Sequence, residues 1–214
     1  VAYVDLFELF ESQDEVLYFE HDSHWNSRGA ALAADAINSA LGVSSNYGEG
    51  FDYETSQHTG DLFEMLYPAG EDGETNDEPT AMNFNQGENV RPDSITIDTT
   101  GAGELNLLMF RDSFGELLYP FMAESSAAAR FSRMAAYDLT LAEELSSTAV
   151  VIELVERNLS WLYEQAATYP APERELEFTA AQSGTATATF EEAYEDAHRV
   201  SGVISGEMDV ASPV

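Results

Sequence analysis

The sequence predicts an α/β sandwich with a mostly parallel sheet. Two unbroken apolar runs, Leu105–Phe110 and Ala149–Leu154, have the length and composition of strands that are buried on both faces. Each run is followed by a segment with apolar residues at helical spacing, which begins at Phe114 in the first case and at Leu159 in the second. Alternation of buried strands with helices is typical of α/β folds.

The first part of the chain adds three expected elements. Apolar side chains recur at helical spacing over Val4–Phe10, and the short β-prone run Val16–Phe19 predicts a strand. A longer helix is expected to start at Asn26 or Ser27, either of which can cap it, and to end at Gly42.

The middle of the chain, Tyr47–Asp98, is predicted to be rich in loops. It offers one short helix at Leu62–Leu66, an acidic stretch with glycines at Gly70–Pro79 and an edge strand at Ile95–Ile97. A loop of this length within a compact domain is often functional, although an acidic insertion is an equal alternative.

A domain boundary is expected near residue 170. After Pro170 and Pro172 the pattern changes, and Glu175–Ala180 and Thr185–Phe190 alternate like exposed strands. The sequence therefore predicts an α/β domain over residues 1–170 and a β-containing appendage, or the start of a second domain, over residues 171–214. Because Val1 already lies in a stretch with structured character, we expect the first domain to be truncated at its N-terminus.

The charge of the chain excludes one class of partner. The sequence carries 40 acidic residues against 8 basic ones, all of them Arg, for a formal net charge of -32. Such a field repels the phosphates of nucleic acids and anionic membranes, so we expect no nucleic-acid partner. An acidic surface without lysine also suits a high-salt, halophilic habitat, where screening relieves self-repulsion.

Cysteine is absent, which excludes disulfides, thiol catalysis and cysteine-ligated metals. No stretch approaches the ~18 apolar residues of a membrane helix, so any anchor is expected upstream of Val1. Nothing in the sequence calls for a metal or an organic cofactor.

Three residues have the types and positions that serine acyl transfer requires. Such chemistry needs a hydroxyl, an imidazole that takes its proton, and a carboxylate that orients the imidazole. Asp22 and His24 are two residues apart, which places both side chains on one side of an extended segment. Ser113 lies in the turn between a buried strand and a helix, where helix-start amides can face an oxyanion. The sequence therefore predicts Ser113 as nucleophile, His24 as base and Asp22 as orienting acid.

Each of these residues also has a simpler interpretation. An Asp-x-His pair is often structural, and an Asp-Ser pair after a strand is often a helix cap. A metal site is a further alternative, because imidazole and carboxylate suit zinc or iron. Its ligands would be the following residues: His21, Asp22 and His24, with His58 and Asp61 as additional candidates.

Three neighbouring side chains are candidates for binding substrate or supporting the site. Trp25 is expected to pack under the histidine loop rather than to stack on a sugar. Asn26 either caps the helix or orients the site. Arg111 is expected to pair with a nearby acid, the alternative being a bidentate contact with the carboxylate of an anionic sugar.

Four ordered blocks resemble the alginate O-acetyltransferase-like SGNH hydrolase family. The first, Tyr18–Gly29, contains Asp-Ser-His-Trp-Asn-Ser-Arg-Gly and is similar to that family's Asp-x-His-Trp-Asn-x-x-Gly block. The others are Gly60–Leu66, Phe110–Phe114 and Val150–Arg157, and the resemblance spans roughly Asp14 to Leu159.

The resemblance implies a flavodoxin-like, three-layer SGNH hydrolase core and gives Ser113, His24 and Asp22 the triad roles named above. It further implies a periplasmic or other extracytoplasmic enzyme that transfers acetyl groups to an exported polysaccharide through an acetyl-serine intermediate. The acetyl donor would come from a partner such as a membrane acyltransferase. Two alternatives stay open: a carbohydrate acetylesterase of the same fold, and a non-catalytic polysaccharide-binding or assembly protein.

Overall fold

The structure is a computed structural model that describes residues 1–134, 137–165, 167–169, 185–195 and 200–209. The chain divides into two compact units, residues 1–167 and residues 168–214. In the second unit, strands β8 (Thr185–Glu195) and β9 (Val200–Asp209) pair antiparallel. The strand expected at Thr185–Phe190 is the first half of β8, whereas Glu175–Ala180 lies outside the described residues.

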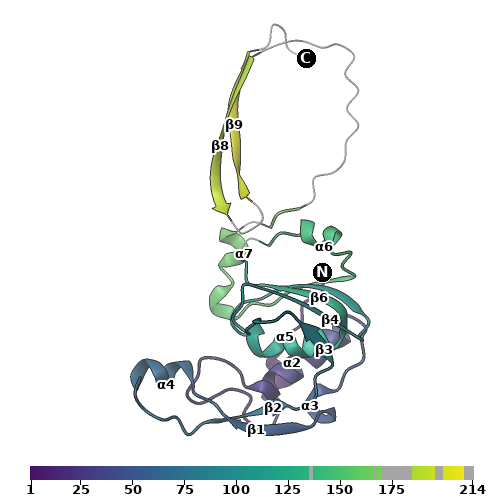
Figure 1. Cartoon of the computed structure of the whole chain (residues 1–214), viewed down its shortest axis with the longest axis vertical. Coiled ribbons are helices and arrows are strands. Elements are labelled where there is room, and N and C mark those ends of the chain that lie inside the picture. The colour runs from purple at the N-terminus through teal and green to yellow at the C-terminus, as the bar shows by residue number, and fades with distance from the viewer. Residues whose placement is uncertain (135–136, 166, 170–184, 196–199, 210–214) are drawn as a thin grey trace. The chain divides into compact units, whose positions relative to one another are not determined.

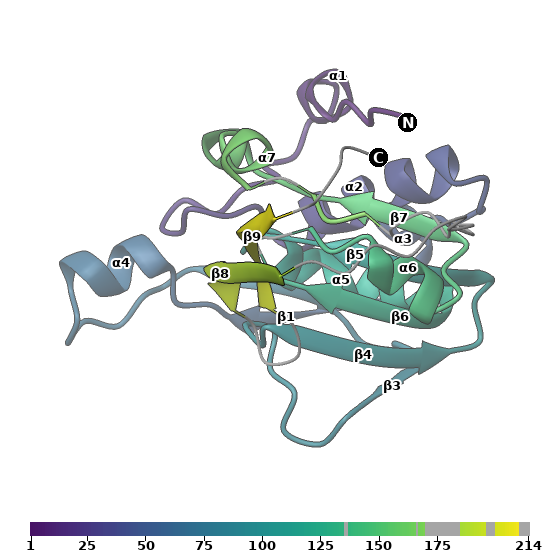
Figure 2. The ribbon, with the colours of Figure 1, turned by 90° about the horizontal axis from the view of Figure 1, so that it is seen from above.

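The first unit is built on a five-stranded sheet (Figure 1). Its strands lie in the order β3-β4-β6-β5-β7, which can be followed across the sheet in Figure 2. Their bounds are β3 Phe84–Gln86, β4 Thr96–Gly101, β5 Leu105–Phe110, β6 Ser126–Ser132 and β7 Ala149–Ile152.

This sheet is mixed, so the expectation of a mainly parallel sheet holds for only half of it. β5 pairs parallel with both β6 and β7, while β4 pairs antiparallel with β3 and β6. The reason is the short turn at residues 102–104, which makes β4 and β5 run in opposite directions. Helix α5 (Gly115–Glu124) then carries the chain back, and β6 inserts between them. β6 is therefore parallel to one neighbour and antiparallel to the other.

Both faces of β5 are covered, which explains its unbroken apolar sequence. Leu107 and Met109 belong to the core that includes α5 and helix α2 (Ser27–Ala40). Leu108 and Phe110 point to the opposite face, where they pack with Tyr137 and the residues of helix α6 (Thr140–Glu144). Side chains alternate along a strand, so four consecutive apolar residues supply two separate cores.

The remaining elements surround this sheet. The segment expected to be loop-rich contains α3 (Tyr47–Gly50), β1 (Tyr53–Gln57), α4 (Asp61–Leu66) and β2 (Thr75–Pro79), with β1 and β2 forming a separate antiparallel pair. The other short helices are α1 Phe7–Glu11, η1 Glu156–Asn158 and α7 Trp161–Glu164.

The prediction of a strand at Val16–Phe19 is wrong. In the part of the chain that the structure describes, this segment joins no sheet and forms one isolated bridge, between Tyr18 and Trp25. The strand predicted at Ile95–Ile97 exists as β4 but is not an edge strand, since β3 lies outside it. No helix among the described residues is both long enough and apolar enough to cross a membrane.

Candidate active site

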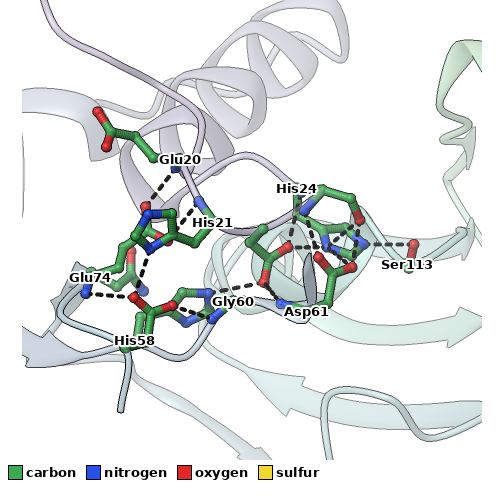
Figure 3. Close-up of polar contacts among 12 residues, drawn as sticks. Glu20, His21, His24, His58, Gly60, Asp61, Glu74 and Ser113 are labelled. Carbon is green, nitrogen blue, oxygen red and sulfur yellow. Dashed lines mark hydrogen bonds and ion pairs between the residues drawn. The ribbon is translucent and has the colours of Figure 1, made fainter. Parts of the chain in front are cut away.

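A continuous chain of hydrogen bonds joins Asp22, His24 and Ser113 (Figure 3). His24 Nε2 lies 2.8 Å from Ser113 Oγ, and His24 Nδ1 lies 2.6 Å from Asp22 Oδ1. Both distances are within the range of a working nucleophile, base and orienting acid. The structure thus brings together the three residues predicted from the sequence, although 89 positions separate the base from the serine.

The end of β5 and the start of α5 position the serine. Phe110 ends the strand and Gly115 begins the helix, so Ser113 lies in the turn between them and is partly exposed. Its carbonyl accepts a hydrogen bond from the amide of Glu116 at 3.1 Å, which fixes the first turn. The hydroxyl is therefore presented at the edge of the sheet where β5 ends.

A narrow loop positions the base. The bridge between Tyr18 and Trp25 closes this loop, and the amide of Phe19 donates to the carbonyl of His24 at 3.2 Å. The side chain of Asp22 also accepts a bond from the amide of His24 at 3.0 Å, which fixes the turn inside the loop. These contacts hold His24 in position, which is what the predicted strand was expected to do.

Trp25 ties the two loops together. Its side chain is 5% exposed, its Nε1–H donates to the carbonyl of Phe114 at 3.0 Å, and the two rings pack edge to face. The ring of Phe114 in turn lies 4.9 Å from that of His24. The indole is therefore buried beneath the site, as the packing interpretation expected.

Asn26 serves as the N-cap of α2. Its Oδ1 accepts from the amide of Gly29 at 3.0 Å, and its Nδ2 donates to the carbonyl of Val16 at 2.8 Å. Of the two roles left open by the sequence, these contacts correspond to capping.

Arg111 is buried under the serine loop and makes no ion pair with the residues that the structure describes, contrary to the expectation. It is 3% exposed, and its Nη2 donates to the carbonyls of Pro92 and Ser94 at 2.5 and 3.2 Å. Burial, together with the nearby charge of Arg133, lowers the pKa of Arg111 to about 10. The contacts place this guanidinium in a structural clamp on the segment before β4.

Two further residues that were weighed only as metal ligands support the acid. His58 Nε2 lies 3.0 Å from Asp22 Oδ2, and the amide of Asp61 donates to the same oxygen at 3.1 Å. Asp61 also accepts from Ser23 through the amide at 2.8 Å and the hydroxyl at 2.6 Å. Sequence reasoning missed this role because His58 is 36 residues from the acid. The resemblance of the block Gly60–Leu66 to the family is the sequence signal that could have pointed to this segment.

Burial alone would raise the pKa of the Asp22 carboxyl, but the hydrogen bonds from the two imidazoles and the Asp61 amide outweigh it. The pKa therefore lies below its ordinary value. The acid is charged at neutral pH and can stabilise a proton on His24.

Comparisons with known proteins show what the chain is similar to. A family model, the SGNH hydrolase-like domain of the acetyltransferase AlgX, matches residues 1–101. These residues are therefore similar to an AlgX-type SGNH hydrolase-like domain. The matched part of this AlgX-type domain contains Asp22 and His24 and ends before Ser113. No curated protein sequence matches the chain.

Solved structures share the fold of this chain. A DHHW family protein from Eubacterium siraeum has a TM-score of 0.56 at 17% identity, over 75% of this chain and 68% of its own. PatB1 of Bacillus cereus has a TM-score of 0.55 at 17% identity, over 72% of this chain and 68% of its own. PatB1 of Bacillus cereus with a sulfonyl adduct has a TM-score of 0.56 at 17% identity, over 73% of this chain and 67% of its own. At these identities the likeness shows the fold alone.

A buried carboxylate holds the serine loop in place. Asp112, 3% exposed, accepts from the amides of Phe114 and Val155, each at 2.9 Å, and from Asn158 Nδ2 at 2.8 Å. Its own amide donates to Glu153 Oε2 at 3.1 Å. Burial, with the charge of Asp112 added, raises the pKa of Glu153 to about 8. Glu153 is thus protonated at neutral pH.

The metal interpretation fits this geometry poorly. Two groups in the described residues have ligand atoms within 4.8 Å of one another, namely His21, Asp72 and Glu74, and Asp22, His24 and Asp61. In each group a ring Nδ1 lies 2.6 or 2.7 Å from a carboxylate oxygen, which is the spacing of an N–H···O bond. The carboxylates also accept backbone amides, so part of their lone pairs is already engaged in hydrogen bonds. The geometry favours hydrogen-bonded networks over ligand sets.

Proposed function

We propose that the chain catalyses serine-dependent O-acetyl transfer. The observation that carries the proposal is the hydrogen-bonded chain from Asp22 through His24 to Ser113, with distances of 2.6 and 2.8 Å. The match of residues 1–101 to an acetyltransferase domain family supports the acetyl group as the cargo.

In the first step, His24 Nε2 takes the proton of Ser113 Oγ as the oxygen bonds to the acetyl carbonyl carbon. The carbonyl electron pair moves to its oxygen and returns when the bond between carbon and donor oxygen breaks. The imidazolium of His24 then protonates the departing alcohol. The product is an acetyl-serine, and Asp22 stabilises the imidazolium throughout.

The second step repeats this sequence with an acceptor hydroxyl. His24 takes the proton of the acceptor, the acceptor oxygen bonds to the acetyl carbon, and the bond to Ser113 Oγ breaks. His24 returns the proton to the serine. Each acetyl group moved therefore leaves the enzyme unchanged, and no metal or organic cofactor takes part.

Backbone amides at the serine turn are the expected oxyanion donors. Their hydrogen bonds in the structure indicate which of these amides is available. The amide of Phe114 is engaged by Asp112 Oδ1 at 2.9 Å, so it is not free for an oxyanion. We assign the amide of Ser113 itself, which has no such partner among the contacts of the described residues. Loss of one such donor costs about 2.7–4 kcal/mol in comparable sites.

The acceptor is proposed to be an exported polysaccharide, with the protein acting in the periplasm or at the cell surface and receiving acetyl groups from a partner. This rests on the similarity of residues 1–101 to an AlgX-type domain. With a net charge of -32, transfer to a polyanionic acceptor should require salt to screen repulsion.

The proposal is tested by labelling the full chain with a fluorophosphonate probe and locating the adduct by mass spectrometry. We expect the label on Ser113, with labelling abolished in Ser113→Ala and strongly slowed in His24→Gln. Equal labelling of the wild type and Ser113→Ala would overturn the proposal. Product analysis with an acetyl ester and an oligosaccharide then shows where the acetyl group goes.

A carbohydrate acetylesterase is the second candidate, and one observation favours it. The side chain of His24 is 22% exposed and Ser113 is also partly exposed, so water can reach the acetyl-serine. Release of acetate at the same rate with and without an oligosaccharide acceptor would identify an esterase. Glycan binding without any serine adduct would instead indicate a non-catalytic polysaccharide-binding protein.

A further inference from the structure

Among the described residues, the side chain of His58 makes one polar contact, and that contact is with the acid of the proposed site. Its Nε2 lies 3.0 Å from Asp22 Oδ2, the oxygen that His24 does not use (Figure 3). The result is a line of four side chains in the order His58, Asp22, His24 and Ser113.

The two oxygens of Asp22 divide their partners evenly. Oδ1 accepts from the ring and the amide of His24, whereas Oδ2 accepts from His58 and from the amide of Asp61. A carboxylate with donors on one oxygen alone can rotate about its terminal bond, which is soft. Donors on the second oxygen oppose that rotation and hold Oδ1 against His24 Nδ1.

The ring of His58 is itself fixed. It stacks on Phe19, with ring centroids 3.9 Å apart and an interplanar angle of 11°. Its backbone amide donates to the carbonyl of Glu74 at 3.0 Å, so the residue is anchored to the start of β2. Because Phe19 lies in the loop that carries the base, the stack couples His58 to that loop as well.

Gly60 explains how this second support reaches the acid. A Cβ at Gly60 would lie 2.0 Å from the carbonyl oxygen of His21 and 2.9 Å from the amide nitrogen of Asp22. The two backbones are therefore in direct contact, and only glycine permits it. This approach places the amide of Asp61 and the ring of His58 on the same oxygen.

We propose that His58 is a positioning residue of the acyl-transfer site. It donates a hydrogen bond to Asp22 Oδ2 and thereby fixes the acid that orients the base. Among the described residues its polar side-chain contact is with Asp22 and not with Ser113, so its effect on the reaction passes through Asp22. The inference rests on the proposed function, since it assigns His58 a role in that same chemistry.

The test uses two substitutions that separate the ring from the donor. His58→Gln keeps an N–H donor at about the position of Nε2 and loses the stack on Phe19. His58→Phe keeps the stack and loses the donor. Acetyl-ester hydrolysis by the full chain is measured as kcat, KM and the pH dependence of kcat, with thermal melting to follow folding.

For His58→Phe we expect about a 10-fold lower kcat with little change in KM, the cost of one hydrogen bond to a charged group. The pH profile of kcat should also differ from that of the wild type, because Asp22 without its second donor no longer holds a fixed position against His24. His58→Gln should keep both the wild-type profile and most of kcat.

The outcomes separate this inference from the function on which it rests. If the wild type labels no serine, or Ser113→Ala hydrolyses the ester equally well, the proposed function fails. If Ser113 is labelled but folded His58→Phe keeps the wild-type kcat and pH profile, the positioning role of His58 is overturned. The role is also overturned if both variants lose activity equally without a change of profile, since this would indicate only structural damage.

Discussion

Glu153 and Asp112 form a carboxyl pair directly behind the nucleophile loop, with Glu153 Oε2 accepting the amide of Asp112 at 3.1 Å. Asp112 accepts three hydrogen bonds, from the amides of Phe114 and Val155 and from Asn158 Nδ2. Burial, together with the nearby Asp112, raises the pKa of Glu153 to about 8. The loop that presents the serine is therefore sensitive to pH above neutrality.

The first prediction concerns stability against pH. Between the ordinary carboxyl pKa of 4.5 and about 8, the folded state holds a proton on Glu153 that the unfolded state has lost. The free energy of unfolding should therefore fall as pH rises through this window. Glu153→Gln, which mimics the protonated form, should be more stable than the wild type at pH 8, by about 1–3 kcal/mol. Urea titrations of both proteins at pH 5 and pH 8 give the comparison, and an equal difference at the two pH values would contradict it.

Gly60→Ala adds only one methyl group, yet we expect it to disrupt the site. A Cβ 2.0 Å from the carbonyl of His21 forces the two backbones apart and withdraws the Asp61 amide from Asp22. We expect fluorophosphonate labelling of Ser113 to be at least about 10-fold slower, because the site loses one charge-assisted hydrogen bond. Gly73→Ala is the matched control, because a Cβ there has nothing within 4 Å. Equal labelling rates in the two variants would refute the prediction.

Trp25→Phe tests the tie between the base and nucleophile loops. The substitution removes the N–H that donates to the carbonyl of Phe114 at 3.0 Å and leaves that carbonyl buried without its partner. Unfolding free energy should fall by about 1–3 kcal/mol. Trp161→Phe serves as control, since Trp161 is only partly buried. A smaller loss for Trp25→Phe than for the control would show that the indole N–H contributes nothing.

Arg111→Met tests whether Arg111 holds the segment before β4 in place or binds substrate. The guanidinium bonds the carbonyls of Pro92 and Ser94, so its loss should lower the melting temperature, by the equivalent of about 1–3 kcal/mol, and leave KM for an acetyl ester unchanged. Arg91→Met, which removes an exposed pair with Asp93, should cost less than about 1 kcal/mol. Unchanged stability with a raised KM for an anionic acceptor would instead make Arg111 a substrate-binding residue.

The sequence predicted the parts of the site whose geometry is local. Asp22 and His24 are two residues apart, and Ser113 follows a strand that an unbroken apolar run predicts with its true bounds, Leu105–Phe110. Such features depend on neighbours in the chain. The prediction of these residues therefore did not depend on the strand expected before the histidine loop, which is a single bridge in the structure.

What the sequence did not reveal depends on contacts between distant segments. β6 lies at the centre of the sheet, yet Ser126–Ser132 carries three alanines and an arginine and has no strand pattern of its own. Pairing on both sides stabilises it as a strand, which overrides weak propensity. His58 was missed for the same reason, because only the fold brings it to Asp22.

The bond from Trp25 to Phe114 joins the residues that directly follow the base and the nucleophile. The chain has two tryptophans, and this one is buried, packed on Phe114 and hydrogen-bonded. In a Trp161→Phe background, the intrinsic fluorescence of the protein would come from a single fluorophore located where the two loops meet. Separation of the loops would then register as a red shift of emission, without any added dye, so the protein carries its own optical reporter of active-site assembly.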